Sequence, residues 1–238
     1  MLKQVIDWAQ MVVTVVEGLL LVRLIMLKLH RTYAFITLYC VVSVFFDGAT
    51  WYLGWQSKES EQIFIYSLFF FTVLYPLVVW DVFEESKTQM AKLRRLQTVR
   101  LVSGLFLTGI CALLLGLNLD ATDAKGNSAM PAFMGIFLLT GSASGAAAFI
   151  WVARRFVRSQ KIALAHNTII WMIFFFLVFC LQILFCMLTI TRGYVAAIVA
   201  DSIALVLLAA DLLVLAWCIL RLKAVPSDAA PAGADGSA

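Results

Sequence analysis

Long, nearly unbroken apolar runs alternate with short polar segments along the chain. A bilayer core about 30 Å thick takes roughly 20 apolar residues per helix. None of the runs alternates polar and apolar residues as the strands of a membrane barrel do, and a helix satisfies its own backbone hydrogen bonds in lipid. The pattern predicts an all-α, polytopic bundle of seven transmembrane helices over Val5–Leu27, Tyr33–Leu53, Gln62–Phe83, Thr98–Leu117, Pro131–Ala153, Asn167–Ile190 and Tyr194–Leu220.

The polar segments differ in charge between the two sides of the predicted membrane. Those after the first, third, fifth and seventh runs hold 13 of the 18 Lys and Arg residues, and those on the other side hold 4. Because basic residues stay on the cytoplasmic side, the N-terminus is predicted outside and the C-terminus in the cytoplasm. Asp81, Glu84 and Glu85, at the inner end of the third run, are expected to be solvated. We predict a seven-helix transmembrane domain over residues 1–223 and a disordered cytoplasmic tail over residues 224–238.

Composition narrows the class of protein further. The chain is 63% hydrophobic and 13% charged, about half the charged share of a soluble domain. This excludes a cytosolic globular protein, a disordered chain and a nucleic-acid binder. We expect a multi-pass protein of a bacterial inner (plasma) membrane, with anionic lipid at its basic cytoplasmic loops.

The sequence offers little for catalysis. It has no Walker A motif, no dinucleotide fingerprint and no kinase signature. Its two histidines, His30 and His166, lie at the ends of runs, and no HExxH motif is present. We therefore predict no catalytic residue, no metal site and no cofactor, and an enzyme is the least favoured class.

Ionisable residues within the runs are the candidates for function, because each costs about 2.5–3.5 kcal/mol at a helix centre on insertion scales. Glu17, Asp47 and Asp201 are candidates for a ligand or proton pocket. Arg23 and Asp211 lie at similar depths, about 24–27 Å from the outer ends, and are candidates for a structural ion pair. The alternative is that all five serve as inter-helical hydrogen bonds and ion pairs that fix packing.

Two further features concern helix shape and packing. Pro76 removes one backbone hydrogen bond, frees the carbonyl group of Thr72 and is expected to kink the third helix. Gly141 and Gly145 form a GxxxG pattern among other small residues, which permits close helix approach. That approach serves packing within the bundle or a dimer face.

One stretch carries a family resemblance. The segments Ile65-Tyr-Ser, Val79-Trp-Asp-Val-Phe-Glu84 and Leu93-Arg-Arg-Leu96, with Arg100, resemble the exit of the third span and the basic loop of uncharacterised small bacterial seven-helix membrane proteins. The resemblance covers the middle third of the chain. It implies the seven-helix fold and no known chemistry.

Two functions follow from these observations. The first is a non-enzymatic membrane protein that acts through partners, as a sensor or an accessory subunit, with another membrane protein or a second copy as partner. The alternative is a small-solute or proton-coupled transporter that uses the intramembrane carboxylates.

Overall fold

The computed structural model describes residues 2–54, 57–86, 129–159, 161–191 and 194–225. Within these ranges the regular structure is helical, with six long helices that are all long and apolar enough to cross a membrane. The predicted fourth span, Thr98–Leu117, and the tail from residue 226 onward lie outside the described residues. The helices are α1 (Leu2–Met26), α2 (Ala34–Leu53), α3 (Lys58–Val82), α5 (Ala129–Ser159), α6 (His166–Thr191) and α7 (Ala197–Arg221).

The helix ends differ from the predicted ones for local reasons. Helix α3 begins before Gln62, because the hydroxyl of Ser57 accepts a hydrogen bond from the Ser60 N–H (3.0 Å) and caps the first turn. Helix α5 runs past Ala153 to Ser159. Basic residues are compatible with a helix and favourable in its last turn, so the apolar run underestimates the length of the helix.

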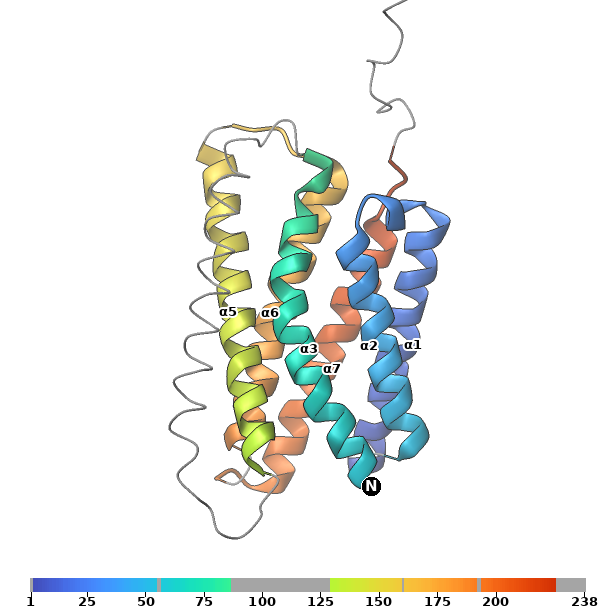
Figure 1. Cartoon of the computed structure of the whole chain (residues 1–238), viewed down its shortest axis with the longest axis vertical. Helices are drawn as coiled ribbons and strands as arrows, with labels where there is room; N and C mark the ends of the chain where they lie inside the picture. The colour runs from blue at the N-terminus through green and yellow to red at the C-terminus, as the bar shows by residue number, and fades with distance from the viewer. Residues whose placement is uncertain (1, 55–56, 87–128, 160, 192–193, 226–238) are drawn as a thin grey trace, which may run out of the picture.

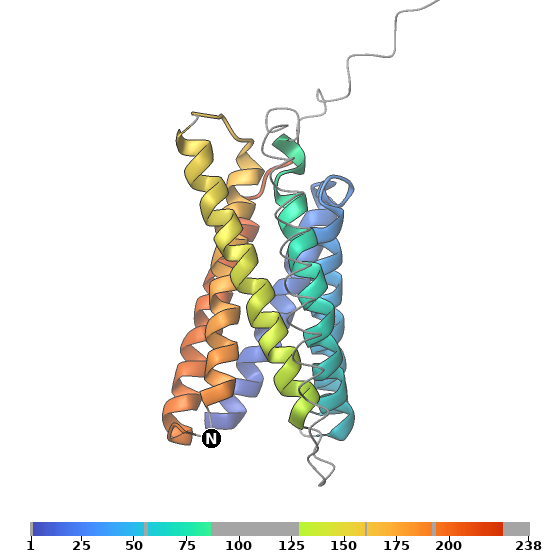
Figure 2. The same ribbon diagram turned by 60° about the vertical axis from the view of Figure 1, so that its left-hand side comes forward.

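The six helices form a closed ring. In order around it, α1 packs on α2, α2 on α3, α3 on α5, α5 on α6, α6 on α7, and α7 on α1. Figures 1 and 2 show α1, α3, α5 and α7 running in one direction and α2 and α6 in the other. We call the end where α1 begins the N-side and the end where α7 finishes the C-side. Helices α3 and α5 are therefore parallel neighbours.

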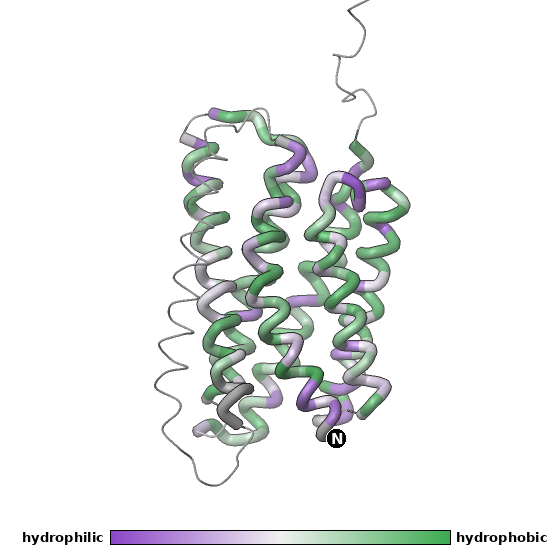
Figure 3. Tube along the Cα trace, viewed as in Figure 1, coloured by the Kyte–Doolittle hydropathy of each residue, from purple (hydrophilic) through white to green (hydrophobic). Residues whose placement is uncertain are grey.

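Hydrophobic residues dominate the middle of each helix, and hydrophilic residues concentrate near the two ends (Figure 3). Aromatic side chains of α6 form the centre of the core toward the C-side. Trp171, Phe174, Phe175 and Phe179 are fully buried. Trp171 stacks on Phe175 at a centroid distance of 5.7 Å and meets Tyr33 edge-on at 5.8 Å. This cluster lies in the C-side half of the ring.

The last turn of α7 is held by neighbouring helices. The guanidinium of Arg23 donates to the carbonyl of Leu222 (3.3 Å). Asn167 donates to the carbonyl of Lys223 (2.8 Å) and accepts from its N–H (3.1 Å), and His166 Nε2 lies 3.0 Å from the carbonyl of Arg221. The carbonyls of Arg221, the last residue of α7, and of the two residues that follow it thus have partners on α1 and α6.

Helix α3 continues through Pro76, and the carbonyl that this proline frees has a partner. The hydroxyl of Ser142 on α5 donates to the carbonyl oxygen of Thr72 at 2.7 Å. A buried carbonyl without a donor would be costly in a membrane. The hydrogen bond to this carbonyl therefore links α3 to α5. The kink at Pro76 stays a prediction.

Replacing Ser142 with alanine is expected to lower the free energy of unfolding by about 1 kcal/mol. The same change in a Pro76→Ala background should cost much less, because the introduced alanine supplies the backbone N–H that the Thr72 carbonyl otherwise lacks as a donor. Thermal unfolding in mild detergent of the four proteins of this cycle measures the coupling. Equal losses in both backgrounds would contradict the pairing of Ser142 with the carbonyl freed by Pro76.

The predicted GxxxG pair does not make the close helix contact in the described part of the chain. A methyl group added at Gly141 or Gly145 would meet nothing within 4 Å. The close approach occurs at Gly135, where an added Cβ would lie 3.0 Å from the Cδ1 atom of Leu68 on α3. Small residues thus pack α5 against α3, but at a position outside the GxxxG pattern.

Candidate functional site

An acidic cavity of about 350 Å³ lies inside the ring. Three helices contribute a carboxyl group to its wall: Glu17 from α1, Asp47 from α2 and Asp211 from α7. Among the described residues that line it, none is a lysine, arginine or histidine. The inner acidic cavity therefore concentrates negative charge at a depth where each charge is expensive.

Hydroxyl groups on the neighbouring helices hold two of these carboxyls. Ser43 Oγ on α2 donates to Glu17 Oε2 at 2.8 Å, and both side chains are buried. Thr14 Oγ1 on α1 lies 3.4 Å from Asp47 Oδ2 and 3.1 Å from the carbonyl oxygen of Gln10, and its one hydroxyl proton is shared between these two acceptors. These bonds run in both directions between α1 and α2, and so fix where the carboxyls face.

A second cavity of about 530 Å³ extends this site toward the N-side. Glu61 from α3, Asp201 from α7 and Ser57, just before α3, line it. It shares five lining residues with the inner acidic cavity, so the two cavities adjoin. The shared residues are Gln10, Thr50, Phe64, Phe185 and Thr189.

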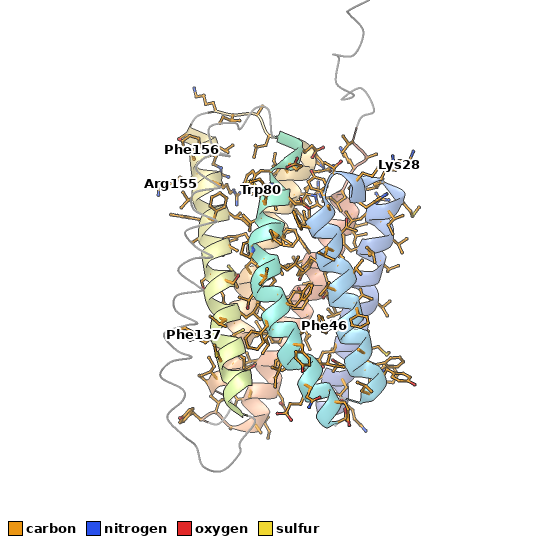
Figure 4. The ribbon with its side chains drawn as sticks, in the orientation of Figure 1. Lys28, Phe46, Trp80, Phe137, Arg155 and Phe156 are labelled. Atoms are coloured by element: carbon orange, nitrogen blue, oxygen red, sulfur yellow. The ribbon has the colours of Figure 1, made fainter. Side chains whose placement is uncertain are left out.

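Aromatic side chains form the walls and the C-side floor of the inner cavity. Phe46, labelled in Figure 4, lines it from α2, and Tyr39 and Tyr75 line it at the depth of the core. Tyr39 meets Phe175 edge-on at 5.6 Å, and Tyr75 lies 4.8 Å from Phe179. Because those phenylalanines belong to the fully buried cluster, the cavity is closed toward the C-side.

The structure brings together only part of the predicted groups. Glu17 and Asp47 line one cavity, and Asp201 lines the adjoining one. The predicted Arg23–Asp211 pair is not formed. Arg23 donates to the Leu222 carbonyl at the C-side, and Asp211 lines the inner cavity with Glu17 and Asp47.

The positions at which α1 and α7 begin explain why the predicted pairing of Asp211 with Arg23 is wrong. Counted from Leu2 and Ala197 at 1.5 Å per residue, Glu17 lies about 22 Å along α1 and Asp211 about 21 Å along α7. On the same scale Arg23 lies about 31 Å along α1. The sequence estimate started α1 three residues late and α7 three residues early, which moved Asp211 from the level of Glu17 to that of Arg23.

Asp81 is a residue whose role the sequence analysis missed. It is buried, not solvated, and its carboxylate accepts hydrogen bonds from the backbone N–H groups of Phe35 and Ile36 (3.0 Å to the latter). Asp81 on α3 therefore caps the N-terminus of α2 from outside that helix. The residue at the N-cap of α2, Tyr33, makes no side-chain capping bond, so the capping acceptor comes from α3.

Tyr33 makes a second contact between the start of α2 and the end of α3. Its hydroxyl donates to the carboxylate of Glu85, which follows α3. Burial and the nearby Glu85 charge raise the pKa of Tyr33 above its ordinary value, so the phenol keeps its proton and remains a donor. The end of α3 is thus tied to the start of α2 by Asp81 and Glu85.

Fold and cavity together define a multi-pass helical membrane protein with an acidic cavity inside its helix ring. No group of three or more His, Cys, Asp or Glu side chains within the described ranges is placed to hold a metal ion. No protein-family model, curated protein or solved structure matches the chain.

Proposed function

We propose that the chain binds a small organic cation in the inner acidic cavity and transports it, with the same carboxyls exchanging protons. The observation that carries this proposal is the lining of that cavity: three carboxyls from three helices, with no basic side chain among the described lining residues. A volume of about 350 Å³ falls within the usual range of small-molecule sites.

Electrostatics favour a cationic ligand. Carboxylates that share a low-dielectric site repel one another, and each charged group at membrane depth is costly. A bound cation or proton offsets both costs. The aromatic walls add cation–π attraction, worth about 0.5–2 kcal/mol per contact, which suits an ammonium or guanidinium ion with a small apolar body.

The asymmetry of the bundle supports transport rather than simple binding. The cavities extend toward the N-side, and the aromatic cluster of α6 closes the C-side. Alternating access requires a state that is open on one side and closed on the other around a site within the bundle. Pro76 adjoins the cavity residue Tyr75 and is the hinge that we propose for the opposite state.

We further propose the finer topology: seven spans in a bacterial inner membrane, with the N-side outside. Parallel packing of α3 and α5 supports an additional crossing, because Ser86 lies at the C-side and Ala129 at the N-side. The apolar run Thr98–Leu117 is our candidate for it. The C-side carries many of the basic residues, which favours a cytoplasmic location, and Figure 4 shows Lys28 and Arg155 at that end.

Uptake into proteoliposomes tests the proposed function. With an inside-negative potential, the wild-type chain is expected to accumulate at least one of three labelled probes: tetramethylammonium, choline or guanidinium. Glu17→Gln and Asp47→Asn should each reduce the initial rate by about tenfold or more, since each removes a carboxyl group that would bind the cation.

A matched control is Asp7→Asn, which removes an acidic group of α1 that lines neither cavity. Its uptake should stay within about twofold of wild type, because Asp7 does not line either cavity. Absence of uptake of all three probes, or unchanged rates in both cavity variants, would rule the proposal out.

A second candidate, action through a membrane partner, has one observation in its favour. Gly141 and Gly145 face open space in the described part of the chain, on an exposed side of α5. Small residues of this kind permit close packing with another helix. Mild-detergent purification with mass identification of bound chains tests this candidate, and a chain recovered alone as a monomer would count against it.

A further inference from the structure

A basic groove of about 400 Å³ lies at the C-side, between the end of α5 and the start of α6. It shares no lining residue with the two acidic cavities. Three of its lining residues are cationic: Arg154, Arg158 and Lys161. The rest of its described lining is aliphatic, including Ile162, Ile169 and Met172.

The fold explains how the three cations come together. Because α5 continues to Ser159, Arg154 and Arg158 lie four residues apart on one helix face. Lys161 then adopts a left-handed conformation (φ 51°) and reverses the chain. Its N–H donates to the Arg158 carbonyl (3.3 Å), and the Ile162 N–H donates to the Val157 carbonyl (3.1 Å), which is the Schellman arrangement of a helix end.

The groove lies where two apolar spans end. The spans of α5 and α6 meet at this end, at Ser159 and His166 respectively. The aliphatic part of the groove is therefore level with the edge of the hydrocarbon, and the long basic side chains reach the headgroup region. A ligand that matches both parts is an amphiphile with an anionic head.

We propose that this groove binds one acidic phospholipid, with its phosphate held by Arg154, Arg158 and Lys161 and an acyl chain lying along the aliphatic floor. Charge complementarity is the argument, since three cationic and no anionic residues are found among the described lining residues. Arginine suits the headgroup because its guanidinium binds phosphate oxygens in a bidentate manner.

The site differs from general attraction between basic loops and an anionic surface. Lys28, Arg31 and Lys223 are also exposed at the C-side, but they do not line this groove. A diffuse effect would depend only on the number of charges near the membrane. Lipid binding at a specific site depends on which charges are removed.

Native mass spectrometry of the full chain in mild detergent tests the proposal, with dioleoylphosphatidylglycerol and dioleoylphosphatidylcholine as probes. The wild type is expected to bind one phosphatidylglycerol at least about tenfold more tightly than phosphatidylcholine. The triple variant Arg154→Gln, Arg158→Gln, Lys161→Gln should lose this preference. The matched triple Lys28→Gln, Arg31→Gln, Lys223→Gln, with the same loss of charge, should keep it within about twofold.

Two further measurements separate a lipid from a free anion. Ile169→Trp keeps every charge but fills part of the floor, at a position that is 43% exposed and so tolerant of a larger side chain. It should weaken phosphatidylglycerol binding, whereas inorganic phosphate should not compete. Equal losses in the two triple variants, no effect of Ile169→Trp, or competition by phosphate would each overturn the proposal.

Discussion

Asp81→Ala is expected to lower the free energy of unfolding by about 2–4 kcal/mol. The Asp81 carboxylate is the acceptor for two backbone N–H groups in the first turn of α2, those of Phe35 and Ile36. Alanine leaves both donors without an acceptor in a buried setting, and the positive end of the helix dipole loses its counter-charge. Equilibrium unfolding in mixed detergent, followed by circular dichroism, measures the loss.

The conservative variant separates capping from packing. Asp81→Asn retains an acceptor oxygen but not the charge, so it should lose about half as much stability as the alanine variant. Asp7→Ala, which removes a carboxylate elsewhere on the chain, should change stability by less than about 0.5 kcal/mol. If Asp81→Ala behaved like Asp7→Ala, the cap would contribute nothing to stability.

Trp171→Ala is the second large effect, and we expect it to cost about 3–5 kcal/mol. The indole is fully buried and contacts Tyr33, Phe174 and Phe175 at centroid distances of 5.7–5.8 Å. Its removal leaves a large void in the cluster that closes the C-side. Thermal unfolding in mild detergent measures the change.

Two comparisons test whether packing is the cause. Trp171→Phe should cost about 1 kcal/mol or less, because the indole N–H has no hydrogen-bond partner in the described part of the chain and phenylalanine keeps most of the ring contact. Trp151→Ala, at a position 53% exposed, should have little effect. A large loss in Trp171→Phe would mean that the indole N–H itself contributes to stability.

Continuous apolar runs were sufficient to predict the six described helices. The residues at which these helices begin and end were harder to predict from the sequence. Capping by Ser57 and the tolerance of helix termini for arginine are local effects that hydropathy does not measure. The predicted span Thr98–Leu117 stays a prediction.

The candidate site was predicted in part. Glu17 and Asp47 could be selected from sequence because an ionisable group at membrane depth is costly, whatever the fold. Asp211 was paired with Arg23 because a three-residue error at each helix start shifts depth by about 4.5 Å. Asp81 was missed because capping across helices depends on which helix ends meet, and a single sequence carries no such information.

Small-residue patterns were similarly ambiguous. Gly135 and the pair Gly141 and Gly145 lie on one helix, and sequence alone does not show which faces α3. The structure places the close contact at Gly135, next to Leu68.

Ring closure by α1 and α7 has a consequence for biogenesis. Helix α1 precedes α7 along the chain, with the other described helices between them, so Glu17 enters the membrane well before Asp211 and the wall that α7 provides. Until then one flank of α1 faces lipid or the insertion machinery. The hydrogen bonds of Arg23, His166 and Asn167 at the end of α7 therefore form when the ring closes. A nascent chain arrested before Ala197 would have a cleft in place of a cavity.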